Sequence, residues 1–186
     1  MEPEDLLTAE LGDTSGCPRT VPGTMFESGG SSLGWAVAAA AGALTADRDR
    51  TAVCLTDDGS YSFGSPDSLL WTQLQHDVPV LTVVFNNRGY RTGSQRLLAH
   101  YPDGYAARSG DLSGGLFDPP PQYAAEAVAA GGFGRKVVAT SELMAALTAA
   151  RRAVVDHRVP AVLDVWLPKH VTGDHPSRPQ GHGAPG

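Results

Sequence analysis

Two short polar segments of the chain carry residues that suit a metal ion and a phosphate. Asp57–Ser60 (DDGS) follows the apolar run Thr51–Thr56, and Asn86–Tyr90 (NNRGY) follows the run Val78–Phe85. The first segment offers carboxylates and backbone N–H groups, and the second offers amide oxygens and a glycine carbonyl. Mg²⁺ prefers such oxygen ligands, because it takes one or two protein carboxylates and completes its octahedron with phosphate oxygens and water. Free N–H groups at a glycine-containing turn before a helix also suit a phosphate.

Both segments are expected at the same edge of one sheet. The apolar runs before them are typical of buried β-strands, and strands alternate with helical stretches along the chain. This alternation predicts an α/β fold with an open, mostly parallel sheet and helices on both faces. In such folds ligands bind beyond the carboxyl ends of the strands. Asp-Gly and Asn-Xaa-Gly are each ordinary turn sequences, so the pair of strand exits, and neither segment alone, favours a binding site.

The remaining elements are predicted from the same patterns. Ser65-Pro66-Asp67 is typical of a helix start, with a capping residue, a first-turn proline and an acidic residue near the positive end. That helix is expected to extend to about His76. The segment 91–121 is rich in Gly, Pro and Asp and is predicted to be irregular. Other strands are predicted at Leu6–Leu11, Arg135–Ala139 and Ala161–Leu167, and other helices at Leu33–Ala46, Gln122–Ala130 and Thr140–His157.

Composition limits the class of protein. The 186 residues include only two cysteines, and 14 Lys and Arg against 20 Asp and Glu give a net charge of −6. We therefore expect one core without a disulfide framework or a zinc cluster, and no nucleic-acid or anionic membrane surface. The apolar stretch Trp35–Leu44 is too short to span a bilayer, and no signal-peptide pattern is visible. These features predict a cytoplasmic protein.

Residues 1–168 are expected to form one domain and residues 169–186 a disordered tail. The tail is polar, rich in Pro and Gly, and almost without apolar anchors. His170, His175 and His182 lie in it, but they lack the fixed spacing of a metal site. A solvated tail is therefore the favoured interpretation.

The motifs resemble those of thiamine diphosphate enzymes. DDGS at 57–60 with NN at 86–87 is similar to their GDG…NN signature. GGSSLGWAVAAAAGAL (29–44) resembles the segment that supports the cofactor's pyrimidine in 2-oxo acid decarboxylases and acetolactate synthases. SLLWTQLQHDVPVLTVVFNNRGY (68–90) and residues 116–150 resemble the benzoylformate decarboxylase and acetolactate synthase branch. The resemblance spans roughly residues 6–168 and implies the thiamine diphosphate-binding fold with thiamine diphosphate and Mg²⁺ as cofactors.

The resemblance implies roles for the residues at the two strand exits. Asp58 matches the metal-binding aspartate, Asn87 matches the metal-binding second asparagine, and Gly89 matches the residue whose carbonyl reaches the metal. Gly59 and Ser60 match the turn that holds the diphosphate.

Three further residues are matched to the cofactor pocket. Ser31 matches the backbone carbonyl that receives the pyrimidine's amino group, and Tyr90 matches a residue that lines the pocket near the diphosphate. Leu33 matches the bulky residue wedged beneath the bent cofactor. Without the family match, Leu33 would be interpreted as a core leucine at a helix start.

Asp57 departs from the family pattern, in which the first residue of GDG is glycine. A carboxylate at this position is expected close to the diphosphate, where like charges repel. The hypothesis is that Asp57 weakens cofactor affinity. A glycine there would also relieve any positive-φ requirement of the turn.

The resemblance covers only the domain that binds the diphosphate. In the family, the glutamate that activates the aminopyrimidine lies on a separate domain, so no catalytic residue is assigned here and activity of the chain alone is not expected. We expect a thiamine diphosphate- and Mg²⁺-binding subunit or domain of a 2-oxo acid decarboxylase or acetolactate synthase-like carboligase. Its expected partners are a separate pyrimidine-binding domain, a homo-oligomer, and a small 2-oxo acid substrate.

The alternative is a non-catalytic, degenerate cofactor-binding or interaction module, and a neighbouring gene for a pyrimidine-type domain would argue against it. Arg91, Arg96, His100 and Tyr101 follow the NN segment and could meet a substrate carboxylate, although surface salt bridges are the commoner role of such residues.

Overall fold

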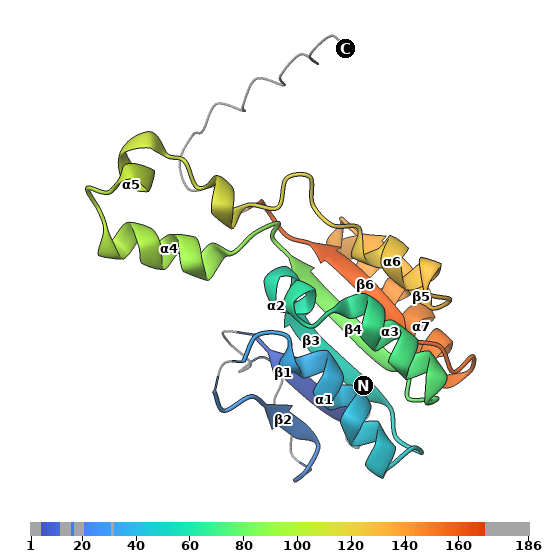
Figure 1. The fold of residues 1–186 in the computed structure, drawn as a ribbon. Coiled ribbons are helices and arrows are strands. Elements are labelled where there is room, and N and C mark those ends of the chain that lie inside the picture. The colour runs from blue at the N-terminus through green and yellow to red at the C-terminus, as the bar shows by residue number, and fades with distance from the viewer. Residues whose placement is uncertain (1–4, 12–15, 17–20, 31, 170–186) are drawn as a thin grey trace, which may run out of the picture.

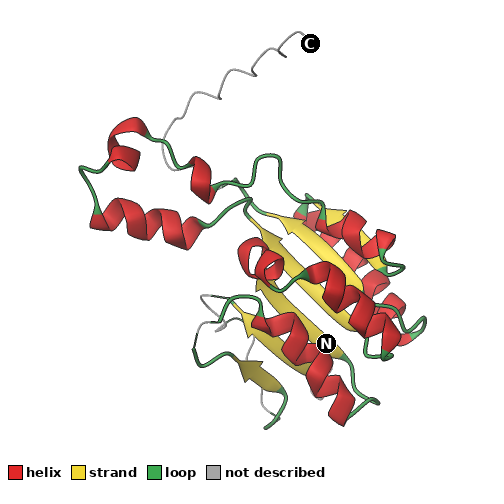
Figure 2. Cartoon of the chain, viewed as in Figure 1, coloured by secondary structure: helices red, strands yellow, loops and turns green. Residues whose placement is uncertain are grey.

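Within the described residues, six parallel strands form the centre of the protein in the spatial order β2-β1-β3-β4-β6-β5 (Figure 2). The fold is described from a computed structural model, for residues 5–11, 16, 21–30 and 32–169. The strands are β1 (Leu6–Glu10), β2 (Met25–Glu27), β3 (Ala52–Asp57), β4 (Val80–Asn86), β5 (Phe133–Val137) and β6 (Ala161–Trp166). Every neighbouring pair is parallel, so the predicted α/β sheet is confirmed.

Helices cover both faces of this sheet (Figure 1). The first face packs against α1 (Trp35–Ala46), α3 (Pro66–Gln75) and α6 (Tyr123–Ala129), and the second packs against α7 (Thr140–Val155). A short helix, α2 (Asp58–Phe63), follows β3 directly. The helices α4 (Arg91–His100) and α5 (Tyr105–Ser109) and a 3₁₀ turn (Ser113–Gly115) follow β4.

The central strand β4 shows why the sheet is buried on both faces. Val80 and Val84 belong to the core under α1 and α3, whereas Leu81 and Val83 belong to the core under α7. Successive side chains of a strand point to opposite faces, so a strand covered by helices on both sides must be apolar at nearly every position. Burying each such side chain stabilises the fold by about 1.5–3 kcal/mol.

The small side chains of α1 allow this helix to lie very close to the sheet. Ala36 and Ala40 are fully buried against it, and the Thr8 hydroxyl of β1 donates a hydrogen bond to the Ala36 carbonyl at 2.9 Å. The helix begins at Trp35, two residues later than predicted. Gly34 has a left-handed φ of 90°, which a right-handed helix does not contain, so the helix cannot include this residue.

The segment predicted to be irregular contains helices, so that prediction is wrong over its first half. Its prolines, at 102 and 119–121, all lie outside α4. The sequence of α4 includes Gln95, Arg96 and two leucines, which are good helix formers. The strand β2 and the one-and-a-half-turn helix α2 were also not predicted, because elements this short carry no periodic pattern.

Residues 91–115, here called the arm, leave the body of the protein and return to it at one place. Gly89 and Leu116 form an antiparallel bridge, and the Tyr90 N–H donates to the Gly115 carbonyl at 2.8 Å. Figure 1 shows the arm projecting from the strand exits, with α4 and α5 away from the sheet. The arm is therefore anchored at its base, next to the NNRGY segment.

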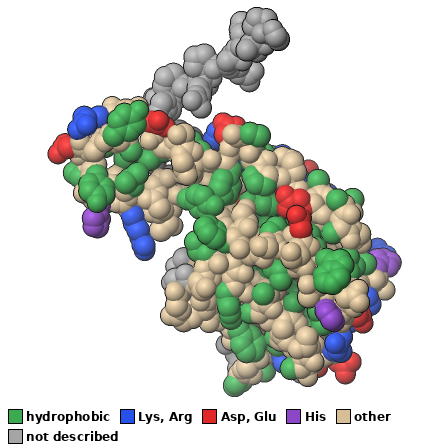
Figure 3. Space-filling model, viewed as in Figure 1, with side chains coloured by type: hydrophobic (Ala, Val, Ile, Leu, Met, Phe, Trp, Pro, Cys, Tyr) green, Lys and Arg blue, Asp and Glu red, His purple; other side chains and the backbone are tan. Residues whose placement is uncertain are grey.

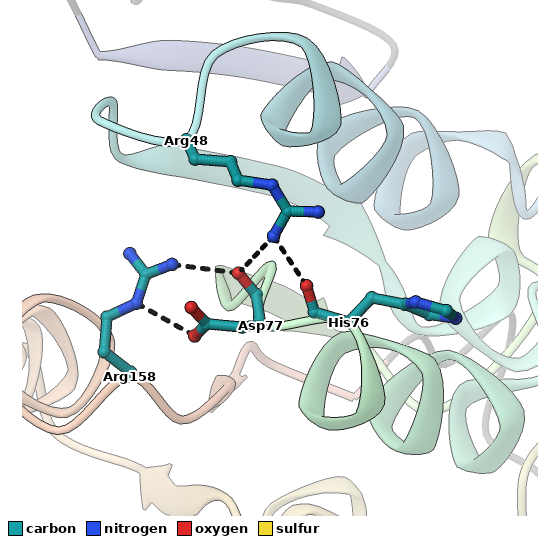
Figure 4. A network of polar contacts seen from close by, with 4 residues as sticks. All are labelled: Arg48, His76, Asp77 and Arg158. Atoms are coloured by element: carbon teal, nitrogen blue, oxygen red, sulfur yellow. Dashed lines mark hydrogen bonds and ion pairs between the residues drawn. The ribbon is translucent and has the colours of Figure 1, made fainter.

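A polar network fixes the loops at the opposite, amino-terminal end of the strands (Figure 4). Arg158 donates to the carboxylate of Asp77 at 3.0 Å and to its carbonyl at 2.9 Å. Arg48 donates to the His76 carbonyl at 2.7 Å. The Arg158 guanidinium lowers the pKa of the Asp77 carboxyl. Because the network is solvent-exposed, its contacts connect the loops before β3, β4 and β6 but contribute little to stability.

The predictions about a membrane span and about the tail concern the whole chain and are tested only in part. In the described residues no helix is long and apolar enough to cross a membrane. The predicted tail, apart from Lys169, lies outside the described residues. The domain boundary at residue 168 therefore stays a prediction.

Gly34 is predicted to be essential for the start of α1. A Cβ at this position would lie 2.6 Å from the Gly64 nitrogen, and the left-handed φ adds about 1–2 kcal/mol of strain for a non-glycine residue. We expect Gly34→Ala to lower the free energy of unfolding by at least about 2 kcal/mol in urea titrations. Gly42→Ala is the control, because its Cβ meets nothing within 4 Å. This variant should raise stability by about 0.5–1 kcal/mol, and equal effects of the two would contradict the argument.

Candidate functional site

A cleft of about 800 Å³ opens at the carboxyl ends of the strands. Its walls are the residues that follow β1, β2, β3 and β4, together with the first turns of α4. From β1 the chain passes to β2 on one side of the sheet, and β3 and β4 continue on the other side. Ligands of open α/β sheets bind at such a switch of direction. Figure 3 shows the surface hollowed where the arm meets the body.

The Asp58 carboxylate joins the two predicted segments below this cleft. Asp58 is 1% exposed, and its Oδ2 accepts a hydrogen bond from the Gly89 N–H at 3.0 Å. Its Oδ1 accepts from the Gly59 N–H at 3.1 Å. The exits of β3 and β4 are therefore brought together, as the parallel sheet predicts.

Burial strongly affects the charge of Asp58. Desolvation raises the pKa of this carboxyl to about 6, and the N–H groups that it accepts from, Gly89 first, act in the opposite direction. The neighbouring Asp57 carboxylate raises the pKa further. A cation beside Asp58 would favour its charged form, so the site is electrostatically suited to a positive ion.

Two buried oxygens of the predicted site residues have no hydrogen-bond partner within the described part of the chain. They are Oγ of Ser60, a residue that is 0% exposed, and Oδ1 of Asn87. Both residues line the cleft. A buried polar atom without a partner costs about 1–3 kcal/mol. Such atoms in a cleft therefore indicate that a ligand completes the site.

A cation at this place would depend on few charged ligands. No group of three His, Cys, Asp or Glu side chains that could hold a metal occurs among the described residues. The oxygens available are the Asp58 carboxylate, the Asn87 amide and the Gly89 carbonyl. This set suits Mg²⁺, which uses one or two carboxylates and keeps other positions for water or phosphate.

The Asp57 carboxylate caps helix α2. Its Oδ1 accepts a hydrogen bond from the Ser60 N–H at 2.6 Å. The φ of Asp57 is −92°, so the turn has no positive-φ requirement at this residue. Asp57 thus uses one of the N–H groups that were predicted to hold a phosphate.

Glu10 is a cleft residue that the sequence reasoning missed. It ends β1, and its Oε2 accepts from the Ala36 N–H at 3.2 Å, so it caps α1. Its other oxygen, Oε1, is buried without a partner in the described chain, and burial raises the pKa of the Glu10 carboxyl. Its position at the end of the first predicted strand, Leu6–Leu11, was the available signal, but that strand is only weakly indicated by the sequence.

An aromatic cluster forms the wall beside the Asp57–Ser60 turn. The Tyr90 ring packs edge-on against Phe117 at a centroid distance of 4.8 Å and also contacts Phe63. A Cβ on Gly59 would lie 3.0 Å from the Tyr90 ring. Tyr90 therefore lines the cleft, and a side chain at Gly59 would require its ring to shift.

The structure places the other predicted residues as follows. Leu33 is 51% exposed and lines the cleft, so its interpretation as a core leucine is wrong. Ser31 lies outside the described residues. Arg91 and Arg96 line the cleft together with the acidic Glu10 and Asp57, whereas His100 and Tyr101 do not line it.

Comparisons with known proteins agree with this geometry. The family model "Thiamine pyrophosphate enzyme, C-terminal TPP binding domain" matches residues 12–165. A 2-hydroxyacyl-CoA lyase of Oryza sativa subsp. japonica is 30% identical over 179 residues, which cover 89% of this chain and 28% of that protein.

Two solved structures share the fold. A benzoylformate decarboxylase from Polynucleobacter necessarius superposes with a TM-score of 0.70 at 24% identity, covering 91% of this chain and 31% of that one. A thiamine diphosphate-dependent 4-hydroxybenzoylformate decarboxylase from Rhodococcus jostii RHA1 gives 0.66 at 22% identity, covering 91% and 30%. The chain thus spans less than a third of the length of each of these three proteins.

Ser60→Ala is predicted to stabilise the ligand-free protein. Removal of a buried hydroxyl without a partner should raise the free energy of unfolding by about 1 kcal/mol, measured by urea denaturation without added ligands. Ser62→Ala is the matched control, because the Ser62 hydroxyl is hydrogen-bonded to the Tyr123 hydroxyl at 2.7 Å. That variant should lose about 1 kcal/mol. If both serines behave alike, the Ser60 hydroxyl is satisfied in the free protein.

Proposed function

Because the chain belongs to the family of C-terminal TPP-binding domains of thiamine pyrophosphate enzymes, we propose that its cleft binds thiamine diphosphate (TPP) through Mg²⁺. The observation that carries the proposal is the convergence of Asp58, Asn87 and Gly89 at adjacent strand exits. Asn87 Oδ1 is buried there and has no partner among the described residues. One carboxylate, one amide oxygen and one carbonyl form a hard-cation site that leaves room for phosphate oxygens.

The residues around this centre fit the rest of the cofactor. The unpartnered Ser60 hydroxyl and the turn at Gly59 would hold the diphosphate, and the Tyr90 ring would line its pocket. The exposed Leu33 would support the bent cofactor from the opposite wall, and Ser31 would accept the pyrimidine's amino group through its carbonyl.

The contribution of this chain to catalysis is binding, orientation and electrostatics. When bound, thiamine diphosphate supplies the carbanion chemistry of its own ring. Asp58 would hold the metal in place, and the hydrogen bond from Gly89 would keep the two strand exits at a fixed distance. The apolar wall of Tyr90, Phe117 and Phe63 would limit access of water.

Activity would require a second domain of the pyrimidine-binding type. The chain matches less than a third of the length of the proteins reported above, and none of its cleft residues is assigned as the group that activates the aminopyrimidine. With that partner, or in a homo-oligomer, the proposed reaction is decarboxylation or carboligation of a small 2-oxo acid in the cytoplasm. The proposal is tested by activity assays with and without a pyrimidine-type domain. It requires that such an acid is turned over only after that domain is added.

One observation favours a second candidate function, a non-catalytic and degenerate cofactor-binding or interaction module. Asp57 places a carboxylate on the Ser60 N–H that would otherwise face the diphosphate. A protein that had lost cofactor binding could tolerate this contact, because it improves the N-terminal cap of α2.

The proposed cofactor site predicts binding that depends on a divalent ion. Titration calorimetry should detect thiamine diphosphate binding with Mg²⁺ and none with EDTA, because the ion links the diphosphate to Asp58 and Asn87. Asp58→Ala and Asn87→Ala should abolish this binding or weaken it at least tenfold.

Asn87→Ala should not lower the free energy of unfolding without ligands, since its Oδ1 has no partner in the described chain. Asp49→Ala, which removes an exposed carboxylate before β3, should bind like the parent. Binding of equal strength with and without Mg²⁺ would disprove the metal-bridged site.

Asp57→Gly is predicted to tighten thiamine diphosphate binding about tenfold, or about 1.4 kcal/mol. The variant removes a like charge and frees the Ser60 N–H, and glycine at a helix cap costs only a few tenths of a kcal/mol. Asp57→Asn separates charge from capping, because it keeps the acceptor and should gain less affinity. If both variants bind more weakly than the parent, Asp57 is a ligand of the metal. If neither variant changes the affinity, Asp57 does not weaken thiamine diphosphate binding.

A further inference from the structure

Arg88 lies between the two proposed metal ligands of the NNRGY segment in an unusual conformation. Its φ is 65°, a left-handed value that costs a non-glycine residue about 1–2 kcal/mol. Asn87 and Gly89 on either side line the cleft, whereas Arg88 does not. The left-handed residue therefore marks a bend of the chain between the two proposed metal ligands.

The backbone of Arg88 is held on both sides. Its N–H donates to Oδ1 of Asn86 at 3.0 Å, and its carbonyl accepts from the Phe117 N–H at 2.9 Å. These two bonds fix the turn against the end of β4 and against the base of the arm.

The side chain of Arg88 extends toward β6, away from the cleft. Its Nη2 donates to the Leu167 carbonyl at 3.1 Å, and its guanidinium carbon lies 4.8 Å from the centre of the Trp166 ring. Lys136 also lies over this ring, at 3.3 Å. Cation–π contacts of this kind contribute about 0.5–2 kcal/mol each.

These contacts close a ring of four residues, which includes the Arg88 backbone N–H. The Trp166 indole N–H donates to Oδ2 of Asp164 at 3.0 Å, and Oδ1 of Asp164 accepts from the Asn86 amide at 2.8 Å. Asn86 in turn binds the Arg88 N–H. Asn86 and Asp164 are buried, so this network is worth more than exposed contacts of the same kind.

We propose that Arg88 is a positioning residue for the metal: through the ring of Asn86, Asp164 and Trp166 it holds the left-handed turn that presents Asn87 and Gly89 to the cleft. The inference rests on the proposed metal site and adds a residue that does not touch the ion. Without the anchor, the turn would sample other conformations, and the cation would have to order it on binding. The expected consequence is weaker metal affinity without a loss of folding stability.

The test uses Arg88→Gly in the full chain. Glycine accepts the left-handed φ without strain, so the free energy of unfolding should change little while the anchor is removed. Affinity for Mn²⁺, as a probe for Mg²⁺, is measured by electron paramagnetic resonance in the presence of thiamine diphosphate. Arg88→Gly should weaken Mn²⁺ binding at least tenfold.

Arg158→Gly is the matched control. Arg158 is also a left-handed arginine, with φ 55°, but it lies at the opposite end of the strands in the network of Figure 4. Mn²⁺ affinity of this variant should equal that of the parent. Arg88→Lys, which keeps a cation for the Trp166 ring, should lose less affinity than Arg88→Gly.

The outcomes separate this inference from the proposed function. If the parent chain binds no Mn²⁺ with thiamine diphosphate, the proposed metal site itself fails. If the parent binds but Arg88→Gly loses less than tenfold, or loses no more than Arg158→Gly, the role of Arg88 is overturned. Trp166→Phe gives a second measurement outside the turn, and it should also weaken Mn²⁺ binding because it breaks the bond to Asp164.

Discussion

The hydrogen bond from the Gly89 N–H to the Asp58 carboxylate is the contact on which the geometry of the site depends. It joins the exits of β3 and β4 at 3.0 Å, and it sets where Asn87 and the turn at Gly59 lie. The bond requires a carboxylate in a buried position, and burial raises the pKa of that group to about 6. Burial of a carboxylate at such a position lowers the stability of the fold, but it creates a site where a cation is favoured.

Acidic side chains at the strand exits also serve the fold itself. Glu10 caps α1 through the Ala36 N–H, and Asp57 caps α2 through the Ser60 N–H. The N–H groups at the start of a helix have no partner in the helix, so a nearby carboxylate satisfies them when no ligand does. At Ser60 the needs of folding and of phosphate binding therefore compete for one N–H group. The Ser60 hydroxyl beside it has no hydrogen-bond partner in the part of the chain that the structure describes.

The two ends of the sheet are held by networks of different character. At the amino-terminal end, Arg48, Asp77 and Arg158 form exposed contacts that tie three loops together. At the carboxyl-terminal end, Asn86 and Asp164 form a buried hydrogen bond. Exposed ion pairs tolerate motion and contribute little, whereas a buried and satisfied network specifies one arrangement. The rigid network thus lies at the end of the sheet that carries the cleft.

The amino-acid pattern predicts the α/β class, the order of most elements, and the two strand exits with Asp58, Asn87 and Gly89. These features are local: apolar runs identify buried strands, and parallel strands must end at one edge of the sheet. The folded chain was needed to see that Asp57 caps α2, that Glu10 reaches the cleft, and that Arg88 stacks on Trp166. It was also needed to see that α4 forms within the segment predicted to be irregular. The direction of a side chain at a strand exit depends on its partners, and Trp166 or Ala36 lies far from these residues in sequence. The periodicity of apolar residues indicates which face of a helix or strand is buried, but it does not identify the residues that pack against that face.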